Sequence, residues 1–175
     1  MSTPAPAPTW AQRLRGQGLA RPPRQAWPAI GRAALGGGLA LAVLAWLTQA
    51  TGSPWMLGSL GASSLMLFAF PDLPFSQPRH VLAGHVLSSA AGLLCLHLLG
   101  PAWWSLGLAM ALAFVAMLAL RVPHPPAASN PVIVFLGQAG WSFLIMPTLV
   151  GAVALLLMAW LYNNLTRPTV YPTYW

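Results

Sequence analysis

Negatively charged side chains are almost missing from this chain. Asp72 is the only acidic residue among 175, and there is no lysine. Charged residues make up 5% of the sequence, whereas hydrophobic residues make up 57%. A soluble domain carries about 25% charged residues, so a water-exposed globular fold is excluded. The composition therefore predicts an integral membrane protein whose main partner is the lipid bilayer.

Cysteine and metal-binding motifs are equally scarce. Cys95 is the only cysteine and lies in an apolar run, which excludes a disulfide framework and a thiolate metal site. His85 and His97 would be separated by about 120° around one helix and about 18 Å along its axis, too far to share a metal. A single acid rules out a catalytic carboxylate pair, and Ser129 with His124 lacks a third orienting group. We therefore expect no metal, no cofactor and no enzymatic activity.

Positive charge comes from eight arginines, which give a net charge of +7. No basic run with interleaved aromatic residues occurs, so nucleic acid is not an expected partner. Residues 1–29 are rich in Pro, Ala and Arg and predict a disordered cytoplasmic tail; residues 164–175 predict a second, short cytoplasmic tail. A secretory signal with Ala33–Leu47 as its apolar region is the alternative, disfavoured by its long lead-in.

Apolar segments fill residues 30–163, the predicted transmembrane domain. The second and fifth are short for a complete crossing, so each is either a half-helix or a re-entrant segment. The sequence predicts an all-α membrane protein with six membrane segments; four full spans with two re-entrant loops is the alternative. The six segments are Ile30–Ala50, Trp55–Phe70, His80–Leu99, Ala102–Leu120, Ser129–Ala139 and Phe143–Tyr162.

The arginines favour six segments. With a cytoplasmic N-terminus, six crossings place the start of the first span, Arg79, Arg121 and Arg167 on the cytoplasmic side and leave every outer loop uncharged. This agrees with the positive-inside rule, whereas a re-entrant second segment would put Arg79 outside. We therefore expect a protein of the bacterial inner (plasma) membrane with both termini in the cytoplasm.

A weak internal repeat also favours six segments. Each half reads as a span, a small-residue break with Ala-Ser, a short apolar helix, a proline and a second span; the breaks are Ala62-Ser63 and Ala128-Ser129. Three segments per half give the halves opposite topology, the inverted 3+3 plan of many transporters. The alternative is chance similarity between apolar segments.

A proline-broken polar stretch, Arg121–Asn130, separates two of the most apolar segments. Its three prolines lack amide donors and disfavour helix in the residues before them, so we expect extended backbone here. Non-helical backbone at membrane depth occurs only inside protein or beside a water-filled cavity. With His124 and Arg121 in the stretch, that cavity is the expected functional site.

The sequence predicts that the candidate site binds an anion. Short helices that begin near Gly61 and Ser129 would point their N-terminal amides at the membrane midplane, where they favour negative charge. The alternative is that these small residues only pack helices and that His124 only satisfies free carbonyl groups. The candidate binding residues are Gly61, Ala62, Ser63, Ser64, His124, Pro125, Pro126, Ser129 and Asn130, and the candidates for anion steering or proton coupling are Arg79, His85, Arg121 and His124.

Together these motifs resemble the HPP family of integral membrane proteins over residues 30–168. The matching motifs are His124-Pro125-Pro126, Gly61-Ala62-Ser63, Gln77-Pro78-Arg79 before Gly84-His85, and Tyr162-Asn163-Asn164. Some plant and cyanobacterial members are implicated in nitrite transport, so the resemblance implies a small-anion transporter or channel. The chain departs from the family pattern after the second proline, with Ala127-Ala128 where Gly-Ala is usual and Ser129-Asn130-Pro131 where small and Thr-like residues are usual.

Two functions compete at this point. The first is transport of a small anion such as nitrite, bound between the two short helices, with His124 as the proton-coupling group. The second is a non-transporting membrane subunit or assembly factor, in which the breaks serve helix packing and a tryptophan-rich rim meets a partner. A homo-oligomer is compatible with both.

Overall fold

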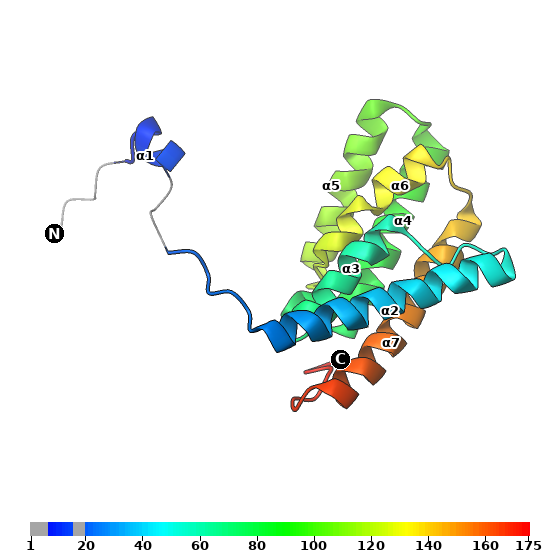
Figure 1. The fold of residues 1–175 in the computed structure, drawn as a ribbon. Coiled ribbons are helices and arrows are strands. Elements are labelled where there is room, and N and C mark those ends of the chain that lie inside the picture. Colours follow the sequence, from blue (N-terminus) through cyan, green and yellow to red (C-terminus); the bar gives the residue numbers. More distant parts are fainter. Residues whose placement is uncertain (1–6, 16–19) are drawn as a thin grey trace.

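The computed structural model describes residues 7–15 and 20–175, which are helical with no strand among them (Figure 1). This confirms the predicted all-α class. The α-helices are α1 Trp10–Arg15, α2 Trp27–Thr51, α3 Gly58–Ala69, α4 Pro78–Leu99, α5 Trp103–Ala119, α6 Asn130–Leu136 and α7 Val150–Thr166, and the other helical turns are η1 Pro74–Ser76, η2 Pro125–Ser129, η3 Trp141–Leu144 and η4 Ile145–Leu149.

Three helical stretches in the described part of the chain are long and apolar enough to cross a membrane. They are α2, α4 and the stretch Trp141–Thr166, which runs through η3 and η4 into α7. The helices α3 and α5 are apolar but shorter. These helices confirm the membrane expectation, while the count of six segments stays a prediction.

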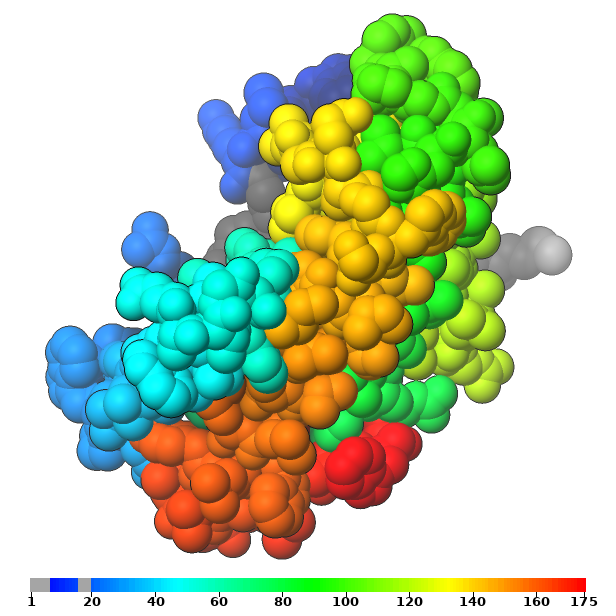
Figure 2. Space-filling view, turned by 90° about the vertical axis from the view of Figure 1, so that its right-hand side faces the viewer, coloured from blue at the N-terminus to red at the C-terminus, as the bar shows by residue number. Residues whose placement is uncertain are grey.

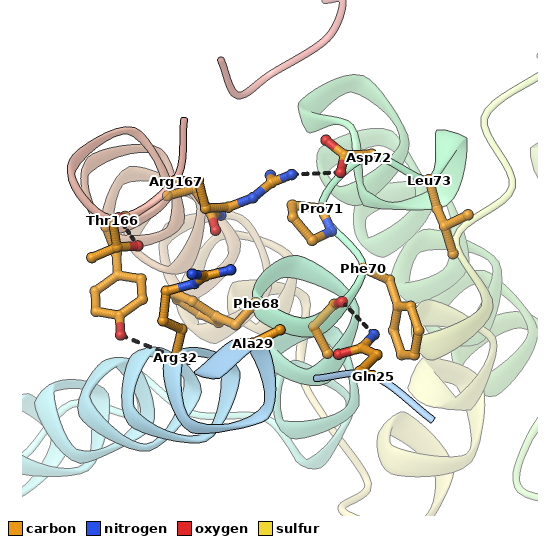
Figure 3. Close-up of a pocket in the computed structure, with 13 residues that line it drawn as sticks. Gln25, Ala29, Arg32, Phe68, Phe70, Pro71, Asp72, Leu73, Thr166 and Arg167 are labelled. Atoms are coloured by element: carbon orange, nitrogen blue, oxygen red, sulfur yellow. Dashed lines mark hydrogen bonds and ion pairs between the residues drawn. The ribbon is translucent and has the colours of Figure 1, made fainter. Parts of the chain in front are cut away.

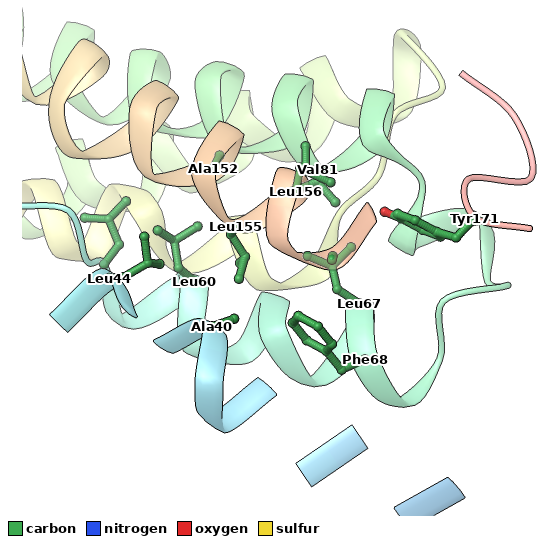
Figure 4. Close-up of a cluster of buried hydrophobic side chains, with 12 residues drawn as sticks. Ala40, Leu44, Leu60, Leu67, Phe68, Val81, Ala152, Leu155, Leu156 and Tyr171 are labelled. Carbon is green, nitrogen blue, oxygen red and sulfur yellow. The ribbon is translucent and has the colours of Figure 1, made fainter. Parts of the chain in front are cut away.

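The bundle packs in two groups around α4. One group joins α2, α3 and α7, whose buried side chains include Leu44, Leu60 and Leu155 (Figure 4). In the other, α5 runs back beside α4 after the tight turn at Gly100 (Figure 1), and Leu93 of α4 packs near Ala109 of α5. Because α4 contacts both groups, polar residues on its buried face lie at the centre of the molecule.

The helix α3 begins at Gly58, so the predicted start near Gly61 is wrong. Trp55 donates its backbone N–H to Thr48 Oγ1 (3.1 Å), which folds the chain back along α2. Leu57 is still extended and serves as the N-cap. Once Pro54 is passed nothing opposes a helix, so it starts one turn earlier than the Gly61-Ala62-Ser63 motif.

The prediction of extended backbone throughout the proline-broken stretch is wrong for its second half. His124 is extended, but Pro125–Ser129 forms the 3₁₀ turn η2, which runs directly into α6 because Ser129 is itself helical. Proline fixes φ near −65°, which suits the first turn of a helix. Pro125 and Pro126 therefore end the extended segment and start the next helical one.

Both tails differ from a plain disordered segment. Part of the predicted N-terminal tail, residues 1–6 and 16–19, lies outside the described residues, while α1 forms one fully exposed helix and α2 already begins at Trp27. At the other end, Tyr171 is 1% exposed and donates its hydroxyl to the Ser76 carbonyl (2.8 Å). Figure 2 shows these last residues seated against the body of the protein. Tyr171 thus anchors the C-terminal segment to the core.

Gly92→Ala is expected to destabilise the protein, whereas Gly38→Ala is not. A Cβ on Gly92 would lie 2.9 Å from the Pro131 Cα, at the contact of α4 with α6. Backbone cannot move aside without strain, so we expect a loss of about 1–3 kcal/mol. Gly38 of α2 has nothing within 4 Å of the added atom, and alanine is the better helix former. Unfolding in mixed micelles would measure both; equal stabilities would contradict the packing.

Candidate functional site

A serine hydroxyl bridges two imidazole rings at the centre of the bundle. Ser63 Oγ lies 2.9 Å from His85 Nε2 and 2.8 Å from His124 Nε2. All three side chains are fully buried. The two rings are also in contact edge to face, with centroids 5.2 Å apart. The three side chains therefore form one cluster that is buried inside the bundle.

Three separate elements supply these side chains. Ser63 comes from α3, His85 from α4 and His124 from the extended segment before η2. Gly84 makes the approach possible, because a Cβ there would lie 2.7 Å from the His124 Cβ. The glycine before His85 is thus the point at which the proline-broken segment meets α4.

Asn130 extends the cluster toward α7. Its Nδ2 lies 3.0 Å from His85 Nδ1, 3.2 Å from the His85 carbonyl oxygen and 2.9 Å from Ser89 Oγ. Ser89 Oγ in turn lies 3.0 Å from Thr148 Oγ1. The result is a continuous buried network from the Phe75 carbonyl to Thr148, which we call the Ser–His network: it consists of Ser63, His85, Ser89, His124, Asn130 and Thr148.

The hydrogen-bond directions in this network follow from its carbonyl acceptors, because a carbonyl cannot donate. A carbonyl oxygen only accepts, so the Asn130 atom facing the His85 carbonyl is the NH₂ group. His85 Nδ1 then accepts from Asn130, and a neutral His85 donates from Nε2 to Ser63. His124 Nδ1 donates to the Phe75 carbonyl (2.7 Å), so a neutral His124 can only accept at Nε2, and the Ser63 hydroxyl is its donor. The Ser63 hydroxyl also donates to the Ser59 carbonyl (3.0 Å). Because a hydroxyl has one hydrogen, His124 Nε2 and the Ser59 carbonyl share it.

Two buried oxygen atoms beside the network have no partner among the described residues. They are Asn130 Oδ1 and Ser59 Oγ, and Ser59 lies one helical turn before Ser63 on α3. Each residue is at most 2% exposed. An unpartnered buried polar group costs about 1–3 kcal/mol, so each of these oxygen atoms would gain free energy from a polar partner.

A further histidine holds the proline-broken segment from its other side. His80 Nδ1 donates to the Pro123 carbonyl (3.0 Å), and Tyr174 donates its hydroxyl to His80 Nε2 (3.1 Å). His80 therefore connects the start of α4, the HPP motif and the C-terminal segment. This contact positions the backbone immediately before His124.

The sequence-predicted site residues divide into two groups. Ser63, His85, His124 and Asn130 come together in the Ser–His network. The others take no part in its hydrogen bonds. Two serines bond nearby carbonyl groups instead: Ser64 that of Gly61 and Ser129 that of Pro126. The residues without a polar side chain are Gly61, Pro125 and Pro126, and those exposed at the surface are Ala62, Arg79, Arg121 and Ser129.

Sequence reasoning missed His80, Ser89 and Thr148. Ser89 stands four residues after His85, so the two share one face of α4, and this spacing could have identified it. Nothing local marks Thr148, which follows the irregular turn at Met146 and Pro147. In the described part of the chain no group of three or more His, Cys, Asp or Glu side chains could hold a metal.

The apolar helical bundle with a buried polar break at its centre is that of an integral membrane protein. The chain belongs to the HPP family: residues 22–172 match the family model described as "HPP, transmembrane region". Two transmembrane proteins of Dictyostelium discoideum are similar to it. One is 31% identical over 128 residues, covering 69% of this chain and 45% of the relative; the other is 29% identical over 129 residues, covering 69% and 42%.

The chain thus spans less than half the length of these curated relatives. No solved structure matches it. The relatives come from a eukaryote, and the bacterial inner membrane remains a prediction.

Proposed function

We propose that the protein is a membrane transporter or channel for a small anion such as nitrite, and that the anion passes together with one proton. The observation that carries this proposal is the Ser63 hydroxyl held between two buried imidazoles. Ionisable groups inside membrane segments are costly and mark ion pathways or proton relays. Here two of them share one hydrogen-bond partner.

One proton on this pair would create the charge that an anion needs. With both imidazoles neutral, the Ser–His network carries no net charge, so a bare anion would have no counter-ion there. A proton on either ring gives one buried cation, and a second proton is opposed by the first at a ring-centroid distance of 5.2 Å. The pair therefore suits a stoichiometry of one proton to one monovalent anion, which moves no net charge.

The unpartnered oxygen atoms support a ligand in this place. Asn130 Oδ1 would accept a hydrogen bond from the proton-bearing form of the ligand, and Ser59 Oγ can donate to an anion oxygen. Entry to the site would come from the side of α5. A cavity of about 310 Å³ lies there, bounded by His124, Phe114 and Met117.

The predicted topology fits this proposal. Gln25, just before α2, donates to the Ala69 carbonyl at the end of α3, and Tyr162 of α7 donates to the Arg32 carbonyl of α2. Arg167 pairs with Asp72 at the same end. We expect this arginine-bearing end to face the cytoplasm, with six membrane segments in two inverted halves whose short helices α3 and α6 each contribute to the Ser–His network.

Uptake into proteoliposomes tests the proposal. Purified protein would be given nitrite, with nitrate and formate for comparison, at two external pH values. Saturable nitrite uptake that increases with an inward proton gradient is the expected result. If folded and correctly inserted protein takes up none of the three anions, the non-transporting membrane subunit becomes the better account.

A further inference from the structure

A polar cavity lies at the arginine-bearing end of the bundle, apart from the Ser–His network. It has a volume of about 390 Å³ and opens between the start of α2 and the C-terminal ends of α3 and α7 (Figure 3). Small-molecule sites commonly measure about 300–1,000 Å³. None of the network's side chains lines this cavity. It is therefore a separate feature that the transport proposal does not use.

Two guanidinium groups line the cavity from different helices. Arg32 reaches it from α2, and Arg167 reaches it from just beyond α7 (Figure 3). Arg167 Nη2 pairs with Asp72 Oδ2. Because Asp72 is the only acidic residue of the chain, no second acidic side chain exists for Arg32. The cavity wall thus carries two positive charges against one negative charge.

Arg167 also has an unused donor. Its Nη1 is buried and has no hydrogen-bond partner among the described residues. Other polar groups of the wall are already engaged: Gln25 donates to the Ala69 carbonyl and Asn163 donates to the Leu67 carbonyl. Arg32 therefore supplies the positive charge without an acidic partner, and Arg167 supplies the donor without an acceptor.

Arg167 at the C-terminus of α7 is also expected for a simpler reason, since a positive charge there interacts favourably with the helix dipole. That reason does not apply to Arg32, which lies near the N-terminus of α2. The dipole explains neither a cavity between the two arginines nor a buried guanidinium nitrogen without an acceptor, which costs free energy unless a ligand supplies one.

We propose that this cavity binds a phosphoryl group, carried either by an anionic lipid headgroup or by a soluble phosphate ester. Guanidinium groups match phosphate oxygens in pairs and bind them with charge-assisted hydrogen bonds. Phe68, Phe70 and Leu73 add an apolar wall suited to the carbon part of such a ligand. The bound phosphoryl group bridges Arg32 and Arg167 and so ties α2 to the end of α7.

Ligand-dependent thermal unfolding of the full chain in detergent tests this proposal. Inorganic phosphate is titrated at constant ionic strength against chloride, and phosphatidylglycerol is titrated against phosphatidylcholine. We expect one or both phosphate-bearing probes to raise the melting temperature by about 2–4 °C. A response to phosphatidylglycerol alone assigns the site to a lipid headgroup, and a response to inorganic phosphate assigns it to the phosphoryl group as such.

Three variants decide whether the response comes from this cavity. Arg32→Gln changes an exposed side chain, so it should fold, and it should raise the probe concentration for half-maximal stabilisation at least about tenfold. Asp72→Asn releases Arg167 and should lower that concentration. Arg15→Gln removes the same charge from the exposed helix α1 and should leave it unchanged. No response to either probe, or an equal response in Arg32→Gln and the unmodified protein, overturns the proposal.

Discussion

His124→Gln is expected to lower proton-driven nitrite uptake by on the order of a hundredfold, the scale on which a positioned proton-transfer group acts. Glutamine has nearly the size of histidine and can still bond the Phe75 carbonyl, but it cannot bind a proton at neutral pH. The Ser63 hydroxyl would then face only one titratable ring instead of two. Uptake that remains should respond less to the proton gradient, because only His85 can still take up a proton. Initial rates at two external pH values, from proteoliposomes with equal amounts of inserted protein, measure both effects.

His97→Gln is the matched control for this variant. This substitution also replaces histidine by glutamine, but at the far end of α4. There the His97 ring is exposed, stacks on Trp141 and bonds the Ala139 carbonyl. We expect its uptake and proton dependence to stay within about twofold of the unmodified protein, since surface changes usually shift free energies by less than about 0.5 kcal/mol. Full proton-dependent uptake by His124→Gln would remove the Ser–His network from the mechanism.

Asn130→Leu is expected to destabilise the folded protein by about 2–4 kcal/mol. The leucine fills a similar volume but removes the donor that serves His85 Nδ1, the His85 carbonyl and Ser89 Oγ. These groups are buried, so they lose a partner away from solvent. The free energy of unfolding in mixed micelles, followed by far-UV circular dichroism, measures the loss.

The adjacent Ser129→Ala provides the comparison for Asn130→Leu. Ser129 is exposed and bonds only the Pro126 carbonyl, so a change within about 0.5 kcal/mol is expected. Ser89→Ala combined with Asn130→Leu should cost less than the two single changes added together, because the two residues share one hydrogen bond. Strict additivity would show that the network is not coupled as its distances indicate.

The prediction that His124 and its neighbours form the site came from a local contradiction in the sequence. Three prolines and a histidine interrupt a chain that is otherwise apolar, and such an interruption is tolerated only within protein. That reasoning places His124 inside the bundle but says nothing of what it meets there. Its partners Ser63 and the Phe75 carbonyl are 61 and 49 residues away, and no local pattern encodes contacts at such separations.

The exclusion of Ser129 from the network has the same origin. Sequence alone treats Ser129 and Asn130 alike, as two neighbouring polar residues at the start of a helix. The 3₁₀ turn over Pro125–Ser129 sets the phase of α6, so Asn130 faces α4 and Ser129 faces away. A phase difference of one residue, about 100° around the helix, decides which of the two is buried.

By itself the sequence determined the membrane class, the helical character and the place of the polar break, because hydropathy and proline geometry act over short stretches of chain. Only the tertiary structure decided that the hydroxyl of α3 stands between the imidazoles of α4 and the HPP segment, and that Tyr174 returns from the C-terminal end to His80. It also decided that Arg32 and Arg167, 135 positions apart in the numbering, line one cavity. Such arrangements depend on how helices pack, and packing is a property of pairs of surfaces rather than of any single segment.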